Sequence, residues 1–386
     1  MGKFAAWFCI VLCLPLAPAG AAGMTQRAGQ PKTRWVQVRA HAHPAKDVRH
    51  QRRAADSAWR LVRLGVAAAA KGLGTRKGSA PPPRWFAPSS PLNTPIAAGA
   101  AVDPGSDAMV AALRADAARQ GWSVGAKLFT PTVWYADAST PRYNVALSSP
   151  WSSMRMMYGV PIPAGAKPDG SSDGHMAVID QSSGCFYEFF VAARNATGGW
   201  QARWANRGLM SGTGIQAGGY STRDTGFANI AGLIRPDELA AGVIDHALTF
   251  STTFTRPGGV VLPATAGGGT YTGPLPPGAA TLPEGARVQL DPGLNLDSLG
   301  LAPWQKTVAR ALQVYGMYLV DTGSLGLYAV NANSFASNPY VPLWGDSTYS
   351  YLPSSLVSHL RVLKLSPQYD ANALASIGPS PCAAMR

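Results

Sequence analysis

Apolar and polar positions divide the chain into many short apolar segments and a few longer segments with helical spacing. Residues 126–136, 142–147 and 245–254 have strand-like lengths, and Gly- and Ser-rich turns bound them. Residues 106–122 and 302–316 repeat apolar positions every three to four residues and predict helices. No regular series of alternating strands and helices occurs. We therefore predict a mainly β fold, an antiparallel, jelly-roll-like β-sandwich with a few peripheral helices.

The first 22 residues have the order of a secretory signal peptide. Lys3 supplies the positive start, residues 4–16 form an apolar core, and "APAGAA" supplies small residues for a cleavage site. The apolar run is too short to span a bilayer. The pattern predicts a secreted, extracellular protein.

The net charge of +13 is concentrated near the N-terminus. Residues 24–84 contain 14 Lys and Arg against two Asp, whereas residues 85–386 contain 18 basic and 18 acidic residues. We predict a basic, Pro-rich, largely disordered arm and linker over residues 23–104 and a single domain over residues 105–386. The arm could touch an anionic surface. The neutral body predicts no nucleic-acid partner.

The segment "SDGHMAVIDQSSGCFYEFFVA" reads as a β-hairpin that carries four titratable groups in a chain poor in charge. Pairing through the "QSSG" loop places Ala177 opposite Glu188 in either of two turn lengths. Side chains alternate across a strand, so Asp173, His175 and Glu188 fall on one face and Asp180 on the other. The hairpin predicts a convergence of three polar side chains.

This convergence permits two kinds of catalysis. Asp173 and Glu188 could act as paired carboxylates on a glycosidic bond, with the pKa of Glu188 raised by flanking phenylalanines. Alternatively, His175 could abstract a proton beside a uronate carboxyl group while Arg203 or Arg223 neutralises that group. The first arrangement is that of a glycoside hydrolase, and the second that of a polysaccharide lyase.

Two further interpretations of the same side chains stay open. A divalent metal could bind Asp173, His175 and Glu188, helped by His246, although no closed zinc spacing occurs and we predict no cofactor. A buried polar network could instead pin the hairpin, with His175 bonded to Glu188. His246 could equally be a core histidine, and Asp321 could cap the turn that follows its strand.

Aromatic residues and cysteines add secondary candidates. Trp200 and Trp204 would share a face of the strand "WQARW" with Arg203 opposite, which suits either a sugar platform or core packing. The two cysteines after the signal segment, Cys185 and Cys382, could form one bridge in an oxidising compartment or stay as two thiols.

Four segments together resemble a family of secreted bacterial proteins, from actinobacteria and proteobacteria, of unsettled activity. They are "DGHMAVID…YEFF", "TGFANIAGLIRPDELAAGVIDHALTF", "LPEGARVQLDP" and "KTVARALQVYGMYLVDTGS". The resemblance covers about residues 127–365. Members often occur beside carbohydrate-binding or Ig-like modules, so the resemblance implies secretion and a glycan-rich setting and carries over no residue roles.

Taken together, the sequence predicts a secreted enzyme whose partner is extracellular or cell-wall polysaccharide. Glycoside hydrolysis ranks first, because paired carboxylates are the clearest feature of the hairpin. A lyase with a histidine base ranks second, and a non-catalytic glycan-binding or structural domain is the alternative from another class.

Overall fold

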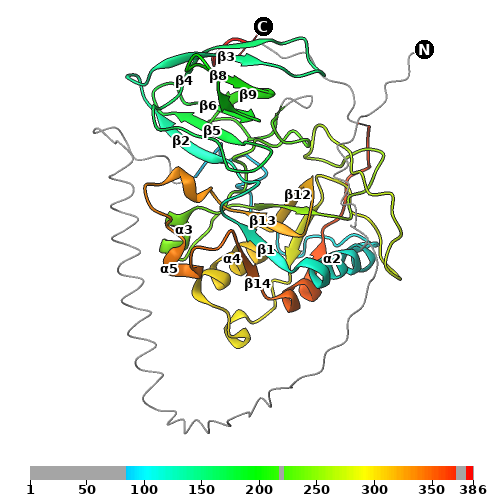
Figure 1. The fold of residues 1–386 in the computed structure, drawn as a ribbon. Helices are drawn as coiled ribbons and strands as arrows, with labels where there is room; N and C mark the ends of the chain where they lie inside the picture. The colour runs from blue at the N-terminus through cyan, green and yellow to red at the C-terminus, as the bar shows by residue number, and fades with distance from the viewer. Residues whose placement is uncertain (1–83, 217–220, 371–379, 386) are drawn as a thin grey trace, which may run out of the picture. The chain divides into compact units, whose positions relative to one another are not determined.

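A computed structural model describes residues 84–216, 221–370 and 380–385 (Figure 1). All of them belong to one compact unit, Gln51–Arg386. The predicted signal peptide and all but the last part of the predicted arm lie outside the described residues. Among the described helices, none is long and apolar enough to cross a membrane.

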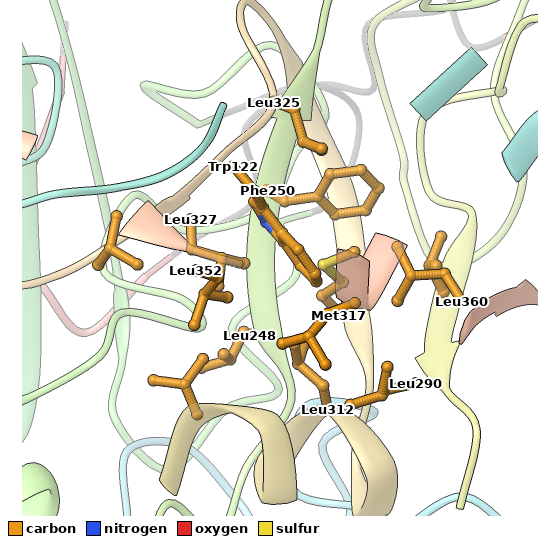
Figure 2. Close-up of a cluster of buried hydrophobic side chains, with 14 of the residues drawn as sticks. Trp122, Leu248, Phe250, Leu290, Leu312, Met317, Leu325, Leu327, Leu352 and Leu360 are labelled. Atoms are coloured by element: carbon orange, nitrogen blue, oxygen red, sulfur yellow. The ribbon is translucent and has the colours of Figure 1, made fainter. Parts of the chain in front are cut away.

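The largest sheet has seven strands and carries two of the helices. In spatial order its strands are β14 (Tyr349–Leu352), β1 (Trp122–Gly125), β13 (Gly326–Tyr328), β10 (Leu248–Thr252), β12 (Met317–Thr322), β11 (Arg287–Leu290) and β15 (Leu360–Val362). Helices α2 (Ser106–Gln120) and α4 (Pro303–Val314) bury their apolar positions in the same core as this sheet. Figure 2 shows Trp122, Phe250 and Leu312 within that core.

Two four-stranded sheets make up most of the remaining β structure. One has the order β2 (Thr132–Ala136), β5 (Met176–Asp180), β6 (Cys185–Phe190) and β9 (Trp204–Leu209). The other has the order β4 (Met156–Pro161), β3 (Arg142–Leu147), β8 (Trp200–Ala202) and β7 (Ala193–Arg194). Val145, Val178 and Phe189 belong to one apolar cluster, so the two sheets pack together.

The other face of the β5–β6 hairpin is also covered. Ala177, Ile179 and Phe186 belong to a cluster that contains Phe227, from the loop after β9, and Val320, from β12. The hairpin is therefore buried on both faces, which explains its nearly continuous apolar sequence. Short helices complete the described structure: α3 (Pro236–Ala241), α5 (Val341–Trp344) and the 3₁₀ turns Leu296–Leu299, Ala332–Ser334 and Ser354–His359.

The mainly β character is as predicted, but the sheets do not confirm an antiparallel sandwich. Strand pairs β1–β13, β10–β12, β2–β5 and β3–β8 are parallel. Parallel neighbours need long crossover connections. The connection from β10 to β12 contains β11 and α4, and the connection from β2 to β5 contains β3 and β4. Apolar periodicity predicts the individual strands and does not reveal these distant pairings.

Packing begins earlier in the chain than the predicted start at residue 105. Trp85, Phe86 and Leu92 are buried in the same cluster as the hairpin. The Asn93 side-chain amide donates to the carbonyl oxygens of Trp85, Phe86 and Ala87. The Pro-rich composition of residues 84–104 indicated a linker, whereas its few large apolar residues form part of the core.

At the C-terminal end, Cys382 forms a disulfide with Cys185 of β6. The bridge is the first of the two alternatives that the sequence left open. It ties residues 380–385 to the start of β6, where Cys185 and Cys382 are both buried.

Candidate active-site cleft

A cleft of about 1060 Å³ lies where the hairpin, the loop after β9 and the end of β12 meet. Its charged and imidazole side chains come from segments far apart in the sequence, and they are Asp173, His175, Arg223, Asp224, Asp321 and Asp370. Trp151, Phe190 and Trp204 supply aromatic surface, and residues 258–259 and 266–268 supply small residues. The cleft therefore combines acidic groups with stacking surfaces.

The hairpin has the predicted register. Ala177 pairs with Glu188, and the antiparallel pairing continues beyond the strands, where the Val191 N–H donates to the Asp173 carbonyl oxygen at 2.7 Å. Asp180 is held elsewhere, because its carboxylate accepts from the hydroxyl groups of Ser182 and Ser183. As predicted, Asp180 takes no part in the group around His175.

Asp173 and His175 reach the cleft together. The Asp169 carboxylate fixes the preceding turn by accepting the N–H groups of His175 and Phe129, each at 2.8 Å. His175 Nε2 then lies 3.7 Å from Asp173 Oδ2, and the imidazole ring lies 5.5 Å from the ring of Phe190. Burial raises the pKa of Asp173, whose side chain is 39% exposed.

The protonation state of His175 follows from its neighbours. Burial, and then the positive charge of Arg223, lower the pKa of His175 to about 3, so the imidazole is neutral at ordinary pH. The Asn229 amide nitrogen lies 2.7 Å from His175 Nδ1 and donates to Thr222 Oγ1 at 3.2 Å. An amide nitrogen in this position donates to Nδ1 as well, so the imidazole proton is on Nε2, facing Asp173.

Glu188 is placed next to this group and does not line the cleft. Its side chain is fully buried and accepts the backbone N–H groups of Thr222 at 3.0 Å and Asn229 at 2.6 Å. Burial raises the pKa of Glu188 to about 7 against these hydrogen bonds. Glu188 therefore holds the loop after β9, and Asn229 stands between it and His175. The predicted bond between His175 and Glu188 is therefore wrong: the side-chain amide of Asn229 meets His175, and the backbone N–H of Asn229 donates to Glu188.

Arg223 and Asp321 occupy the middle of the cleft. Arg223 Nη1 lies 3.8 Å from Asp321 Oδ2, and the guanidinium carbon lies 4.3 Å from the centre of the Tyr328 ring. The Asp321 side chain is 41% exposed within the cleft, where surrounding protein displaces much of the water. This desolvation raises the pKa of Asp321 to about 6, although Arg223 opposes the shift. Asp321 also accepts the N–H of Thr322, the next residue of β12.

Asp224 and Glu284 form an acidic pair beside Gly267. Both carboxylates approach the point where a side chain at Gly267 would begin: its Cβ position lies 2.7 Å from Glu284 Oε2 and 3.3 Å from Asp224 Oδ2. The two oxygens are therefore at most about 6 Å apart. Glu284 is 1% exposed and accepts the Gly268 N–H at 2.9 Å. Burial, then the charges of Asp224 and Asp321, raise the pKa of Glu284 to about 8. Burial also raises the pKa of Asp224.

Two further predicted site residues, His246 and Arg203, do not line the cleft. His246 does not line the cleft: Nε2 lies 3.0 Å from Glu238 Oε1, and Nδ1 lies 2.9 Å from the Ala247 carbonyl oxygen. Glu238 also binds Arg235 at 2.6 Å, so His246 belongs to a buried charged cluster. Arg203 does not line the cleft itself, and its guanidinium carbon lies 5.1 Å from the ring centre of Trp151, which does.

The predicted Trp200–Trp204 platform is wrong. Trp200 lies in β8 and Trp204 in β9, which belong to different sheets. The chain bends at Arg203, whose N–H donates to the Phe190 carbonyl oxygen. Trp200 is 1% exposed and packs in the core, whereas Trp204, 5% exposed, lines the cleft. A strand-like pattern of five residues did not reveal the change of sheet.

Sequence reasoning missed Asp224, Glu284 and Trp151. Each lies in a loop, without a neighbour in the sequence that indicates chemistry. The fold brings Trp151 and Asp224 into one cleft and places Glu284 near Asp224. Among the described residues, no group of three or more His, Cys, Asp and Glu side chains is arranged to hold a metal ion.

Comparison of the chain with protein-family models, with curated protein sequences and with solved structures gave no match. We therefore infer function from the residues of the cleft.

Proposed function

We propose that the protein is a secreted glycoside hydrolase that acts on extracellular or cell-wall polysaccharide in this cleft. One observation carries the proposal: Asp173, Asp224 and Asp321 line a single cleft, and the pKa of Asp321 is raised to about 6. Glycoside hydrolysis needs one carboxyl group that keeps a proton and another that is ionised. Aromatic rings in the same wall suit a carbohydrate ligand.

The surroundings of the carboxyl groups of Asp321, Asp224 and Glu284 indicate which group donates a proton and which is ionised. Asp321 is the general acid, because it is desolvated, reaches the cleft and keeps a proton near pH 6. Asp224 is the nucleophile or the base that activates water: burial raises its pKa as well, but its exposed position in the cleft lets water solvate the ionised carboxylate. Glu284 lies beneath Asp224 and is protonated at neutral pH, so it adds no second negative charge there.

The surroundings of His175 favour hydrolysis over lyase chemistry. A lyase base needs an unprotonated nitrogen that faces the substrate. Nδ1 of His175 accepts from Asn229, and Nε2 carries the proton. Arg223, the residue expected to neutralise a uronate, has a side chain that is 3% exposed and faces Asp321 and the Tyr328 ring. Asp173 and His175 therefore act as polar contacts to the substrate.

The test is a product screen by mass spectrometry. The wild-type chain and the Asp321→Asn and Asp224→Asn variants are incubated with a panel of bacterial and plant polysaccharides. Asp107→Asn is the matched control, because this exposed aspartate lies in the first turn of α2, outside the cleft. We expect oligosaccharides with one added water from the wild type and the control, and none from the two cleft variants.

Two results would contradict the proposal. Unsaturated products without added water would identify an eliminating lyase. Retention of a glycan without any product, equal in wild type and variants, would identify a glycan-binding domain from the alternative class.

A further inference from the structure

Trp151 stands out among the aromatic residues of the cleft because it is exposed. Its side chain lines the cleft and 51% of its surface is accessible, compared with 5% for Trp204. It belongs to the connection between β3 and β4, far in the sequence from the acidic residues that share the cleft. A large apolar ring exposed to water beside a polar cleft is a common feature of carbohydrate-binding surfaces, where a bound sugar packs on the ring.

Hydrogen bonds hold the turn that carries Trp151, and one cation–π contact holds the ring itself. The backbone N–H of Trp151 donates to Ser149 Oγ at 3.3 Å. The Arg155 guanidinium donates to the carbonyl oxygens of Ser149 and Met154 at 3.4 Å and 3.0 Å. Arg203 packs its guanidinium carbon 5.1 Å from the Trp151 ring centre, within cation–π range. A braced aromatic ring loses little conformational entropy when a ligand packs on it.

The charges of the cleft lining favour an uncharged sugar over an anionic one. Four aspartates line the cleft, and Arg223 is the only Lys or Arg among its described lining residues. The Arg223 side chain is 3% exposed and lies between Asp321 and the Tyr328 ring. Along the cleft lining, an anionic sugar would therefore meet like charges, which are costly in an interface. The exposed Arg203 guanidinium, 5.1 Å from the Trp151 ring centre, is the one positive charge that the described structure places beside this ring. An uncharged sugar ring with an apolar face of C–H groups meets no such penalty.

We infer that Trp151 is the residue that stacks on a pyranose ring of an uncharged polysaccharide chain, and that it determines glycan affinity in this cleft. The inference rests on the proposed function, because it names the substrate class of the same site. Arg203 supports the indole by its cation–π contact. The acidic groups then lie along the same bound chain.

The experiment measures glycan binding by a variant that lacks the proposed general acid, so that cleavage does not interfere. The full chain carrying Asp321→Asn is titrated calorimetrically with neutral hexasaccharides of β-1,4-linked glucose, β-1,3-linked glucose and β-1,4-linked mannose, and with hexagalacturonate. For at least one neutral hexasaccharide, we expect Trp151→Ala to raise Kd by about tenfold or more and Trp151→Phe by less than about threefold. Hexagalacturonate should bind more weakly than the neutral ligand.

Tyr351→Ala is the matched control. Tyr351 is also 51% exposed and lies on β14, outside the cleft, so its removal should leave Kd unchanged. Circular dichroism of each variant checks that the fold is kept. A bound sugar should also shift the tryptophan fluorescence of the Asp321→Asn protein, and the shift should be lost in Trp151→Phe.

The outcomes separate this inference from the proposed function. Binding that depends on Trp151, without cleavage by the wild type, keeps the inference and rejects the hydrolase. Cleavage by the wild type with the same KM in Trp151→Ala keeps the hydrolase and rejects the inference. Tighter binding of hexagalacturonate than of every neutral ligand, or no binding of any of these glycans, also overturns the inference.

Discussion

Individual carboxyl groups in this protein differ because their surroundings differ. Asp180, bonded to two serine hydroxyls, has a lowered pKa, whereas Asp321 and Glu284 have pKa values raised to about 6 and about 8. Glu188 is satisfied by two backbone N–H groups and serves the structure. The same functional group thus anchors a loop at one position and, at another, has a pKa that suits the acid role we propose.

Asp321→Asn should lower kcat by about 100-fold or more, because general acid catalysis typically contributes that much. The wild-type rate should fall as pH rises through about 6, where Asp321 loses its proton. Steady-state rates from pH 4 to pH 9 check both points. A variant that keeps the wild-type rate, or a profile that is flat between pH 5 and pH 7, would remove Asp321 from the role of acid.

Glu188→Gln should destabilise the protein without reshaping the cleft. The glutamine amide can accept only one of the two N–H groups that Glu188 satisfies, and a buried unsatisfied donor costs about 1–3 kcal/mol. The midpoint of urea unfolding gives the change in the free energy of unfolding. Asp107→Asn, at an exposed position, should change it by less than about 0.5 kcal/mol. Equal stability of the two variants would contradict the anchoring role.

Among the elements, the β5–β6 hairpin links the packing of the protein to its site. One face packs with β3 and β8, and the other with the loop after β9 and with β12. The residues just outside its paired strands, Asp173 and His175, therefore enter the cleft from a rigid base. Such a base limits the movement of the two side chains within the cleft.

The Cys185–Cys382 disulfide should stabilise this hairpin and the C-terminal segment together. Replacing both cysteines by alanine should lower the free energy of unfolding by about 2–5 kcal/mol, because the bridge closes a loop with a sequence separation of 197 residues. Thermal unfolding of the variant, and of the wild type with and without reductant, checks this. The wild type in reductant should approach the variant, and insensitivity of both to reductant would contradict the prediction.

At the scale of the whole molecule, several raised pKa values act in the same direction on stability. A carboxyl group whose pKa is higher in the folded than in the unfolded chain binds its proton more tightly when folded. Its contribution to the free energy of unfolding is complete below the pKa of the group in the unfolded chain. The contribution is lost as pH rises through the pKa of the group in the folded chain. For Glu284 this window runs from 4.5 to about 8.

We therefore expect the wild-type free energy of unfolding to fall as pH rises from 5 to 8, by an amount on the order of a few kcal/mol. Glu284→Gln stays neutral and should show a shallower fall. Urea unfolding at pH 5, 6.5 and 8 measures both slopes, with Asp346→Asn, at a side chain that is 70% exposed, as the control. Parallel slopes for the wild type and Glu284→Gln would show that Glu284 is not responsible.

The sequence by itself determined the local features of this protein. Helical spacing predicted α2 and α4, and strand-like runs predicted β3, β5, β6, β10 and β12, because these patterns depend on residues close in the chain. The register of the hairpin was also predictable, since a short loop permits few pairings. Asp173 and His175 were recognised from their places in the hairpin, and Arg223 was named only as one of two arginines that could neutralise a uronate.

Only the tertiary structure decided which of these elements are neighbours. The parallel pairs join strands across long connections, and the break at Arg203 places Trp200 and Trp204 in different sheets. The cleft gathers Trp151, Asp224 and Asp321, and Glu284 lies behind it, although these residues come from separate loops and strand ends. A pKa depends on burial and on charges brought close by the fold, so no pattern of adjacent residues could assign the acidic roles.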